Sequence, residues 1–149
     1  MEKKDKVFKN LFYVKFLGVL MKKGKKTKAK KILDAVLLKV SKKTKIPINL
    51  VLYRVFFRLT TFVEVRRIRS RRSSFYVPFN VSFSRRVFLA LKWIMLAVKM
   101  DKRKVNSVNK ISVELFRVIK NLSTSESLRL KSLNNSQAFA NKANIHFRW

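Results

Sequence analysis

The charged side chains are the part of this sequence best able to do chemistry, and nearly all of them carry the same sign. The chain has 149 residues, with 37 Lys and Arg against 7 Asp and Glu, which gives a formal net charge of +30 at pH 7. The acids are scattered, without the clustering that a two-metal site or an acid–base pair requires. Cysteine is absent and His146 is the single histidine, which excludes thiol nucleophiles and zinc sites built from Cys or several His. We therefore expect no enzyme activity, no metal, no other cofactor and no small-molecule substrate.

The first cluster of cations holds seven lysines within ten residues. No neighbouring acid balances them, so an ordinary solvated helix face explains them poorly, and we interpret them as phosphate contacts. We call this set the lysine cluster: Lys22, Lys23, Lys25, Lys26, Lys28, Lys30 and Lys31.

A second cluster consists of five arginines between two expected strands. Arginine binds phosphates and bases through a planar, bidentate guanidinium, and Lys or Glu would make a surface hairpin equally soluble. We therefore predict RNA contact for these residues, the hairpin arginines: Arg66, Arg67, Arg69, Arg71 and Arg72. Tyr76, His146 and Trp149 are the aromatic side chains that we expect to stack on bases, whereas most of the 13 Phe fit apolar stripes.

Arg85 and Arg86 form a third basic site at the expected start of a helix. The helix dipole disfavours cations at that end. Nothing in the local sequence compensates them, so we predict that an external anion does.

Helical periodicity positions the lysine cluster. Apolar residues recur at helical spacing over residues 8–21, and Gly24 suits a left-handed end to that helix. A second apolar stripe runs over residues 29–40, with lysines on much of the remaining surface. The cluster is therefore expected at the turn between the first two helices.

A third helix is expected from Pro47 to about Leu59, because proline suits the first turn of a helix. We expect Leu50, Tyr53 and Phe57 on its buried face, and we also assign Phe88, further along the chain, to the core.

The hydrophobic period changes to two over residues 75–83, which indicates a strand. Residues 62–65 look like its partner, and the hairpin arginines lie between them. Pro78 cannot donate to a central ladder, so a two-stranded ribbon over about 62–83 fits best.

Three further helices complete the chain. They are expected over residues 85–100 with Ser84 as N-cap, over 105–122, and from Ser123 to the C-terminus, where Ser123 and Glu126 have capping-box spacing. The sequence thus predicts a mainly α fold: one domain over residues 1–149, with about six helices and a β-hairpin protruding between the third and fourth.

Four segments, in order, resemble the bacterial type of small-subunit ribosomal protein seven. The C-terminal segment AFANKANIHFRW is similar to the family's A-x-A-N-K-A-x-x-H-Y-R-W, and LMKKGKKTKA to its L-M-x-x-G-K-K-x-x-A. Val63-Glu64-Val65 and Val77-Pro78 match its hairpin strands, and RRVFLALKWI matches its R-R-x-x-L-A-x-R-W-I. The resemblance covers residues 8–149.

The resemblance implies a helical domain with a protruding hairpin that binds the 3′ major (head) domain of small-subunit rRNA and nucleates the head. It also implies a hairpin and C-terminal helix near the exit-site tRNA and the mRNA path, with small-subunit proteins nine, eleven and thirteen as neighbours. The RNA-binding positions that carry over are Lys25, Lys26, Arg69, Arg85, Arg86, Lys92, Trp93, Lys142, His146, Arg148 and Trp149.

The sequence also departs from the family pattern. Arg71-Arg72 replaces a Gly-Gly hairpin tip, and two arginines resist the positive φ of a tight primed turn, which predicts a wider tip or one ordered by RNA. The basic N-terminal arm of bacterial members is largely missing, and Lys22, Lys23 and Lys28 are extra cations that replace part of its charge.

Composition favours an organellar source. Lys, Phe, Asn and Ile are abundant while Gly and Pro are scarce, a bias typical of A+T-rich genomes, and the start of the sequence shows no import signal. We expect a mitochondrial ribosome, with a plastid or a bacterial cytoplasm as alternatives. An architectural DNA-binding protein or a membrane-surface protein are the rival functions, although no stretch approaches the ~20 apolar residues of a membrane span.

Overall fold

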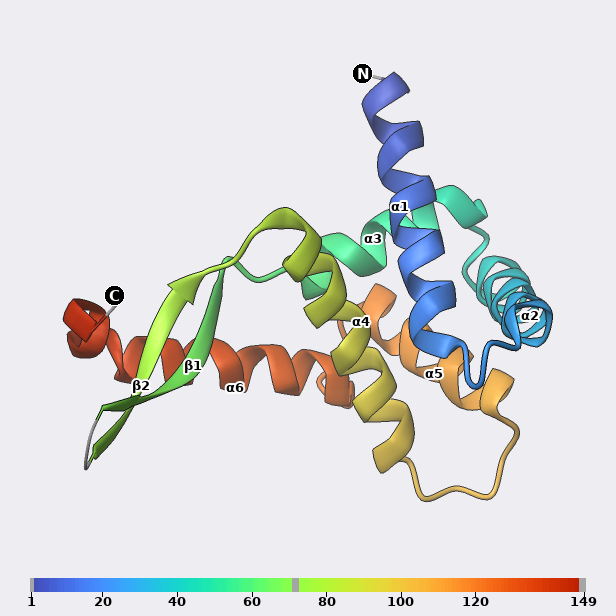
Figure 1. The fold of residues 1–149 in the computed structure, drawn as a ribbon. Coiled ribbons are helices and arrows are strands. Elements are labelled where there is room, and N and C mark those ends of the chain that lie inside the picture. The colour runs from blue at the N-terminus through green and yellow to red at the C-terminus, as the bar shows by residue number, and fades with distance from the viewer. Residues whose placement is uncertain (1, 71–72, 148–149) are drawn as a thin grey trace.

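Six α-helices, a 3-10 helix and a two-stranded hairpin make up residues 2–70 and 73–147, the part of the chain that the computed structural model describes. In chain order they are α1 Glu2–Leu20, α2 Lys26–Thr44, α3 Ile48–Leu59, β1 Val63–Ser70, β2 Ser73–Asn80, α4 Phe83–Met100, α5 Ser107–Lys120, α6 Glu126–Ala140 and η1 Lys142–Phe147. Figure 1 shows α1–α5 gathered in one body, from which the hairpin and α6 extend together. The predicted mainly α fold, with the hairpin between the third and fourth helices, is confirmed.

One apolar core holds α1 to α5 together. The largest of its fully buried side chains come from every one of these helices: Phe12, Phe16, Leu33, Leu37, Leu59, Leu91, Ile94, Ile111 and Leu115. A polar contact also joins the first two helices, since the Tyr13 hydroxyl donates a 2.7 Å hydrogen bond to Asp34. Burial, reinforced by Asp34, raises the pKa of Tyr13 to about 12, so this hydrogen bond persists across the physiological pH range.

The buried face of α3 is not the one predicted from the sequence. Leu50, Tyr53 and Phe57 are 44, 45 and 70% exposed, so their assignment to the core was wrong. The core instead receives the alternative stripe, Val51, Leu52, Val55, Phe56 and Leu59. This helix is apolar nearly all round, so periodicity alone cannot fix its rotation. Packing does, because the ring of Phe56 meets Phe12 of α1 edge to face at 5.6 Å.

The start of α4 also differs from the prediction. Helix α4 begins at Phe83, with Ser82 rather than Ser84 as its N-cap residue, so Phe83 belongs to the helix and not to the strand. Phe88 of the same helix is 40% exposed, so its assignment to the core was wrong as well.

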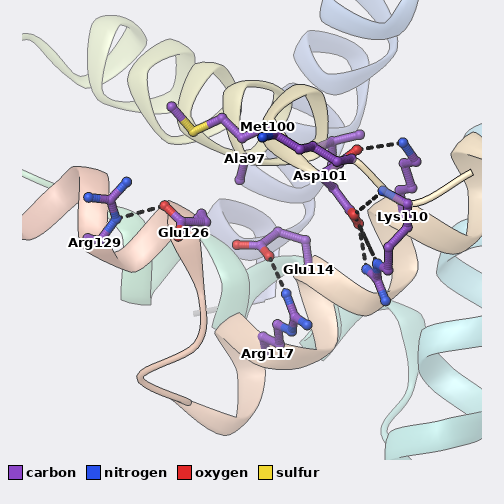
Figure 2. Close-up of a pocket in the computed structure, with 11 residues that line it drawn as sticks. Ala97, Met100, Asp101, Lys110, Glu114, Arg117, Glu126 and Arg129 are labelled. Carbon is purple, nitrogen blue, oxygen red and sulfur yellow. Dashed lines mark hydrogen bonds and ion pairs between the residues drawn. The ribbon is translucent and has the colours of Figure 1, made fainter.

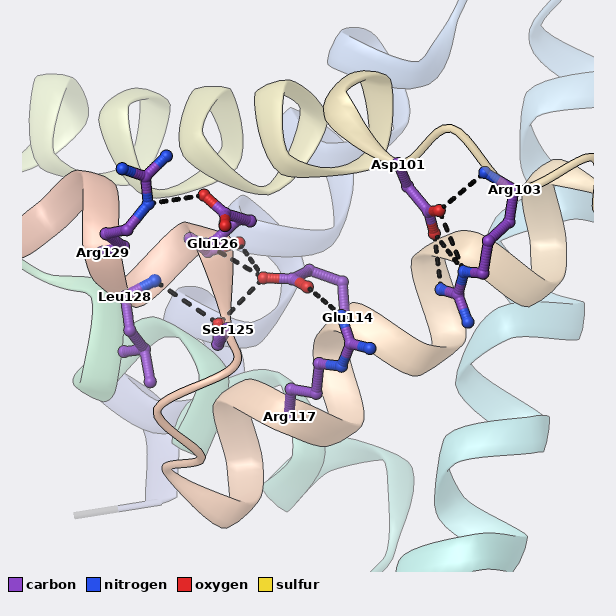
Figure 3. Close-up of polar contacts among 9 residues, drawn as sticks. Asp101, Arg103, Glu114, Arg117, Ser125, Glu126, Leu128 and Arg129 are labelled. Carbon is purple, nitrogen blue, oxygen red and sulfur yellow. Dashed lines mark hydrogen bonds and ion pairs between the residues drawn. The ribbon is translucent and has the colours of Figure 1, made fainter.

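A buried carboxylate fixes the start of α6. Glu114, only 4% exposed on α5, accepts hydrogen bonds from the Ser125 hydroxyl at 2.8 Å and from the backbone N–H and hydroxyl of Ser127 at 3.0 and 2.7 Å (Figure 3). The Ser125 hydroxyl in turn accepts from the backbone N–H of Leu128, so Ser125, and not Ser123, caps the helix. Negative charge at a helix N-terminus is also favoured by the helix dipole.

We predict that Glu114→Ala lowers the free energy of unfolding by about 2–4 kcal/mol, because it leaves two buried serines without their acceptor. The control is Glu126→Ala, which removes the exposed ion pair to Arg129 and should cost less than about 1 kcal/mol. Urea unfolding monitored by circular dichroism measures both. Equal losses in the two variants would show that Glu114 does not anchor α6.

Candidate nucleic-acid interface

The lysine cluster lies on the turn between α1 and α2 and on the first turns of α2. All seven lysines are exposed, and none forms an ion pair with an acid that the structure describes. Lys23 and Gly24 both adopt left-handed conformations, with φ of 51° and 70°, which bends the chain between the helices. Gly24 has the predicted left-handed φ, but α1 ends at Leu20, so Gly24 lies in the turn and does not cap the helix. The result is a dense patch of positive charge with no internal counter-charge.

The hairpin sorts its arginines onto two faces. Strand pairing sets Arg67 opposite Tyr76 and Arg69 opposite Ser74, and directly paired residues share one face of an antiparallel ribbon. Arg67, Arg69 and Tyr76 are all exposed on that face. Arg67 and Arg69, with Ser73 and Ser74, line a hollow of about 550 Å³. Guanidinium and hydroxyl donors around one hollow suit a phosphate.

Arg66 lies on the opposite face of the hairpin and contacts other side chains of the protein. Its guanidinium lies 3.4 Å from the Glu64 carboxylate and 5.4 Å from the centre of the Phe79 ring. The sequence did not distinguish Arg66 from Arg67 and Arg69. Arg71 and Arg72, and with them the predicted wider tip, lie outside the described residues.

Arg85 has an internal partner, contrary to the prediction that only an external anion compensates it. Its guanidinium donates to both carboxylate oxygens of Glu64, at 3.0 and 2.6 Å, which joins the start of α4 to the first strand. Hydrogen bonding from Arg85 holds the pKa of Glu64 below its usual range, and Glu64 likewise raises the pKa of Arg85. The spacing of 21 residues between the partners hid this pair from sequence reasoning.

The remaining predicted residues of α4 differ in what they offer. The Arg86 guanidinium donates to the Val81 carbonyl at 2.9 Å and covers the Phe62 ring at 4.3 Å, so it braces the base of the hairpin. Lys92 is exposed, whereas Trp93 is only 7% exposed. Little of Trp93 is therefore left to meet RNA.

The sequence predicted one helix from Ser123 to the C-terminus, and the structure instead divides this segment into α6 and η1. Helix α6 ends at Ala140, and the Asn141 side chain donates to the Gln137 carbonyl at 2.8 Å. The chain then forms η1 against β2, where the rings of Phe147 and Phe75 stack at 4.6 Å and Asn144 donates to the Tyr76 carbonyl at 3.1 Å.

These contacts bring the predicted C-terminal residues beside the hairpin. Lys142 is exposed over the Phe139 ring, and His146 is exposed on η1. Arg148 and Trp149 lie outside the described residues. The hairpin and C-terminal segment thus form one arm.

Three polar side chains that the sequence analysis missed join α6 to the body and the hairpin. Lys131, partly buried, donates to the Arg58 carbonyl at 2.6 Å, and burial lowers its pKa. Asn134 donates to the Val63 carbonyl at 2.8 Å, and Asn135 accepts from the Thr61 hydroxyl at 2.9 Å. No periodic signal marks these residues, because their partners are about 70 residues away in sequence. They anchor the arm to the helical body.

The acidic side chains form no catalytic or metal site in the described part of the chain. Asp101, Glu114 and Glu126 line a cavity of about 360 Å³, but Figure 2 shows each of them paired with a basic side chain. Bonding to Arg103 holds the pKa of Asp101 far below its usual range. No group of three or more His, Asp or Glu among the described residues is placed to hold a metal ion.

The described helices also include none with the length and apolar character needed to cross a membrane. Two exposed basic surfaces stand out in the described part of the chain: the lysine cluster and the arm face that carries Arg67 and Arg69.

Comparison with known proteins decides the family. The model of the family described as ribosomal protein S7p/S5e matches residues 1–142. The chain belongs to this family. Members of the S7p/S5e family are structural proteins of the ribosome, so the prediction that the chain is not an enzyme is confirmed.

The relatives are bacterial and mitochondrial. The small ribosomal subunit protein uS7 of Petrotoga mobilis is 32% identical over 145 residues, which cover 97% of this chain and 92% of the relative. Its mitochondrial counterpart uS7m from Reclinomonas americana is 29% identical, with 97% and 89% covered. The uS7 of Mycoplasma genitalium is 30% identical, with 97% and 92% covered. The resemblance inferred from four motifs is thereby confirmed over nearly the whole chain.

The Glu64–Arg85 pair of this S7p/S5e protein gives a prediction for pH. A carboxyl whose pKa is lowered by folding adds stability above its unfolded pKa, and this stability is lost as the pH falls through the folded value. Glu64→Gln should therefore lower the free energy of unfolding by about 1–2 kcal/mol at pH 7. The difference from the unsubstituted protein should shrink below pH 4.5, the ordinary pKa of this carboxyl.

Denaturant unfolding at a series of pH values tests the pair. Glu126→Gln, a change in a more exposed acid, is the control and should give a small effect. A Glu64→Gln deficit that stays constant from pH 7 to well below 4.5 would mean that its ion pair does not stabilise the fold.

Proposed function

We propose that this chain is a structural component of the small ribosomal subunit that binds the 3′ major (head) domain of the rRNA and helps to nucleate the head. The match of the S7p/S5e family over residues 1–142 carries the proposal. The relatives are themselves named small ribosomal subunit proteins. The unpaired lysine cluster supports an rRNA partner, because seven exposed cations without acids need an external polyanion.

The two basic surfaces suit different tasks. The lysine cluster lies on the helical body, on the turn between α1 and α2 and the start of α2, where it can bind rRNA together with Lys92. The arm projects from that body, and its exposed Arg67, Arg69 and Tyr76 suit contact with a second RNA (Figure 1). We assign this arm, with Lys142 and His146, to the neighbourhood of the exit-site tRNA and the mRNA path.

The family and the composition support proposals for the neighbours and the compartment. Small-subunit proteins nine, eleven and thirteen are the proposed protein contacts. The A+T-rich composition and the similarity to a mitochondrial uS7m support a mitochondrial ribosome, while the bacterial relatives support a bacterial cytoplasm as the alternative. Cofractionation of the endogenous protein with mitochondrial small subunits in a high-salt gradient tests this, and recovery only with other ribosomes would reject it.

We predict that affinity for a head-domain rRNA fragment falls steeply with salt. If ~6–10 phosphates are contacted, release of counterions lowers the affinity by roughly a thousandfold or more between 50 and 200 mM salt. Filter binding or fluorescence anisotropy with a labelled fragment measures the slope. A flat salt response, or equal affinity for duplex DNA of the same length, would reject specific rRNA binding through phosphates.

We further predict that the two surfaces are separable. Replacing the seven lysines of the lysine cluster by Ala should weaken binding to the head-domain fragment by at least a hundredfold, whereas Arg67→Ala with Arg69→Ala should weaken it less than about tenfold. The control replaces the same seven lysines by Arg, which keeps the charge and should keep most of the affinity. Equal losses from the two alanine sets would remove the proposed division of labour.

A further inference from the structure

A groove beside the lysine cluster has an apolar floor, which phosphate binding alone does not need. It lies between the end of α1, the first turns of α2, the end of α4 and the start of α5, and its volume is about 440 Å³. That volume falls within the roughly 300–1,000 Å³ of typical ligand pockets. Figure 1 shows the turn between α1 and α2 lying close to the start of α5, where the groove is found.

The floor is built from side chains that the core leaves partly uncovered. Ile32 of α2, Met95 and Val98 of α4 are each only partly buried, and Ile32 and Val98 pack against the core from its edge. Val105, which is 45% exposed, closes the groove near the start of α5. Water in contact with these surfaces is displaced favourably by a flat apolar group.

The rim of the same groove is cationic. Lys22, Lys25, Lys28 and Lys99 are exposed around it, and none pairs with an acid that the structure describes. Lys110, also on the rim, donates to the Asp101 carbonyl at 2.7 Å and is therefore directed to the protein. Four ammonium groups around an apolar floor complement a ligand that has a flat body and an anionic edge.

Two helix starts add to this charge. Helices α2 and α5 begin at Lys26 and Ser107, beside the groove, and neither has an acid in its first turn or a side-chain hydrogen bond at its N-cap. The positive ends of both helix dipoles are thus left without a side-chain anion. In α6, by contrast, Ser125 and Glu114 supply these groups.

We propose that this groove receives one unpaired nucleotide of the bound RNA, with its base on the apolar floor and its phosphates against the lysine rim. This inference rests on the proposed rRNA binding and deepens it. Lysine contacts with phosphates do not distinguish one base from another, whereas the groove would add a contact with a base. Single-stranded nucleotides at loops and bulges are the part of RNA whose bases are free to enter such a site.

Abasic substitution of the RNA tests the groove. Each unpaired nucleotide of the head-domain fragment is replaced in turn by an abasic residue, which keeps the phosphate and removes the base. One position is expected to lower the affinity by roughly tenfold. The groove-filling variant Val105→Trp is expected to bind intact RNA with an affinity lower by a similar factor. The abasic substitution at the critical position should then cause no further loss of affinity in this variant.

A matched pair of variants controls for charge and folding. Ile32→Glu places a carboxylate in the groove, while Leu38→Glu places one on the same helix where the side chain is already 51% exposed. Ile32→Glu should abolish sensitivity to the critical abasic position and Leu38→Glu should keep it. Melting curves show whether each variant is folded. If Ile32→Glu does not fold, Val105→Trp, a change at an exposed position, takes its place as the test of the groove.

The possible outcomes separate the groove from the proposed function. Failure of the unsubstituted protein to bind the fragment would reject the proposed function. Two results would overturn the groove assignment alone. In the first, the protein binds tightly and no abasic position lowers the affinity. In the second, the losses of affinity from the abasic substitution and from the groove variant are independent, so that their factors multiply. Groove-dependent binding to vesicles of phosphatidylglycerol and phosphatidylcholine, without any abasic effect, would also overturn it in favour of a lipid.

Discussion

Repulsion among 37 cations that face only seven acids is the constraint on which this structure depends. A chain of this length gains its stability from burial of apolar surface, and that gain must exceed both chain entropy and the repulsion. The helical body meets the requirement with a core drawn from α1–α5 and leaves the lysines on its outer surface. The free protein therefore carries an electrostatic cost that a bound polyanion relieves.

Three of the acids whose side chains the structure describes connect one element to another. Asp34 joins α1 and α2, Glu64 joins β1 and α4, and Glu114 joins α5 and α6. Asp101 binds Arg103 just after α4, and Glu126 pairs with Arg129 in the first turn of α6. Because acids fix the geometry in this way, the remaining cations stay available to partners.

The arm shows how geometry divides a uniform run of charge. Pairing of β1 with β2 separates Arg66, which is used internally, from Arg67 and Arg69, which are not paired with a described acid. Lys131, Asn134 and Asn135 of α6 then hold the hairpin to the body. A rigidly held arm loses less conformational entropy on binding than a flexible one, which favours affinity.

The sequence by itself determined the class of the protein, its elements and its chemistry. The net charge pointed to a polyanion, the period of two located the hairpin, and local motifs indicated the family, because all of these are properties of composition or of neighbouring residues. What only the tertiary structure decided involves residues far apart in the chain. The rotation of α3, the pairing of Arg85 with Glu64 and the buried anchor at Glu114 are of this kind. The groove beside Lys28 is another, since its walls come from four helices that no local pattern brings together.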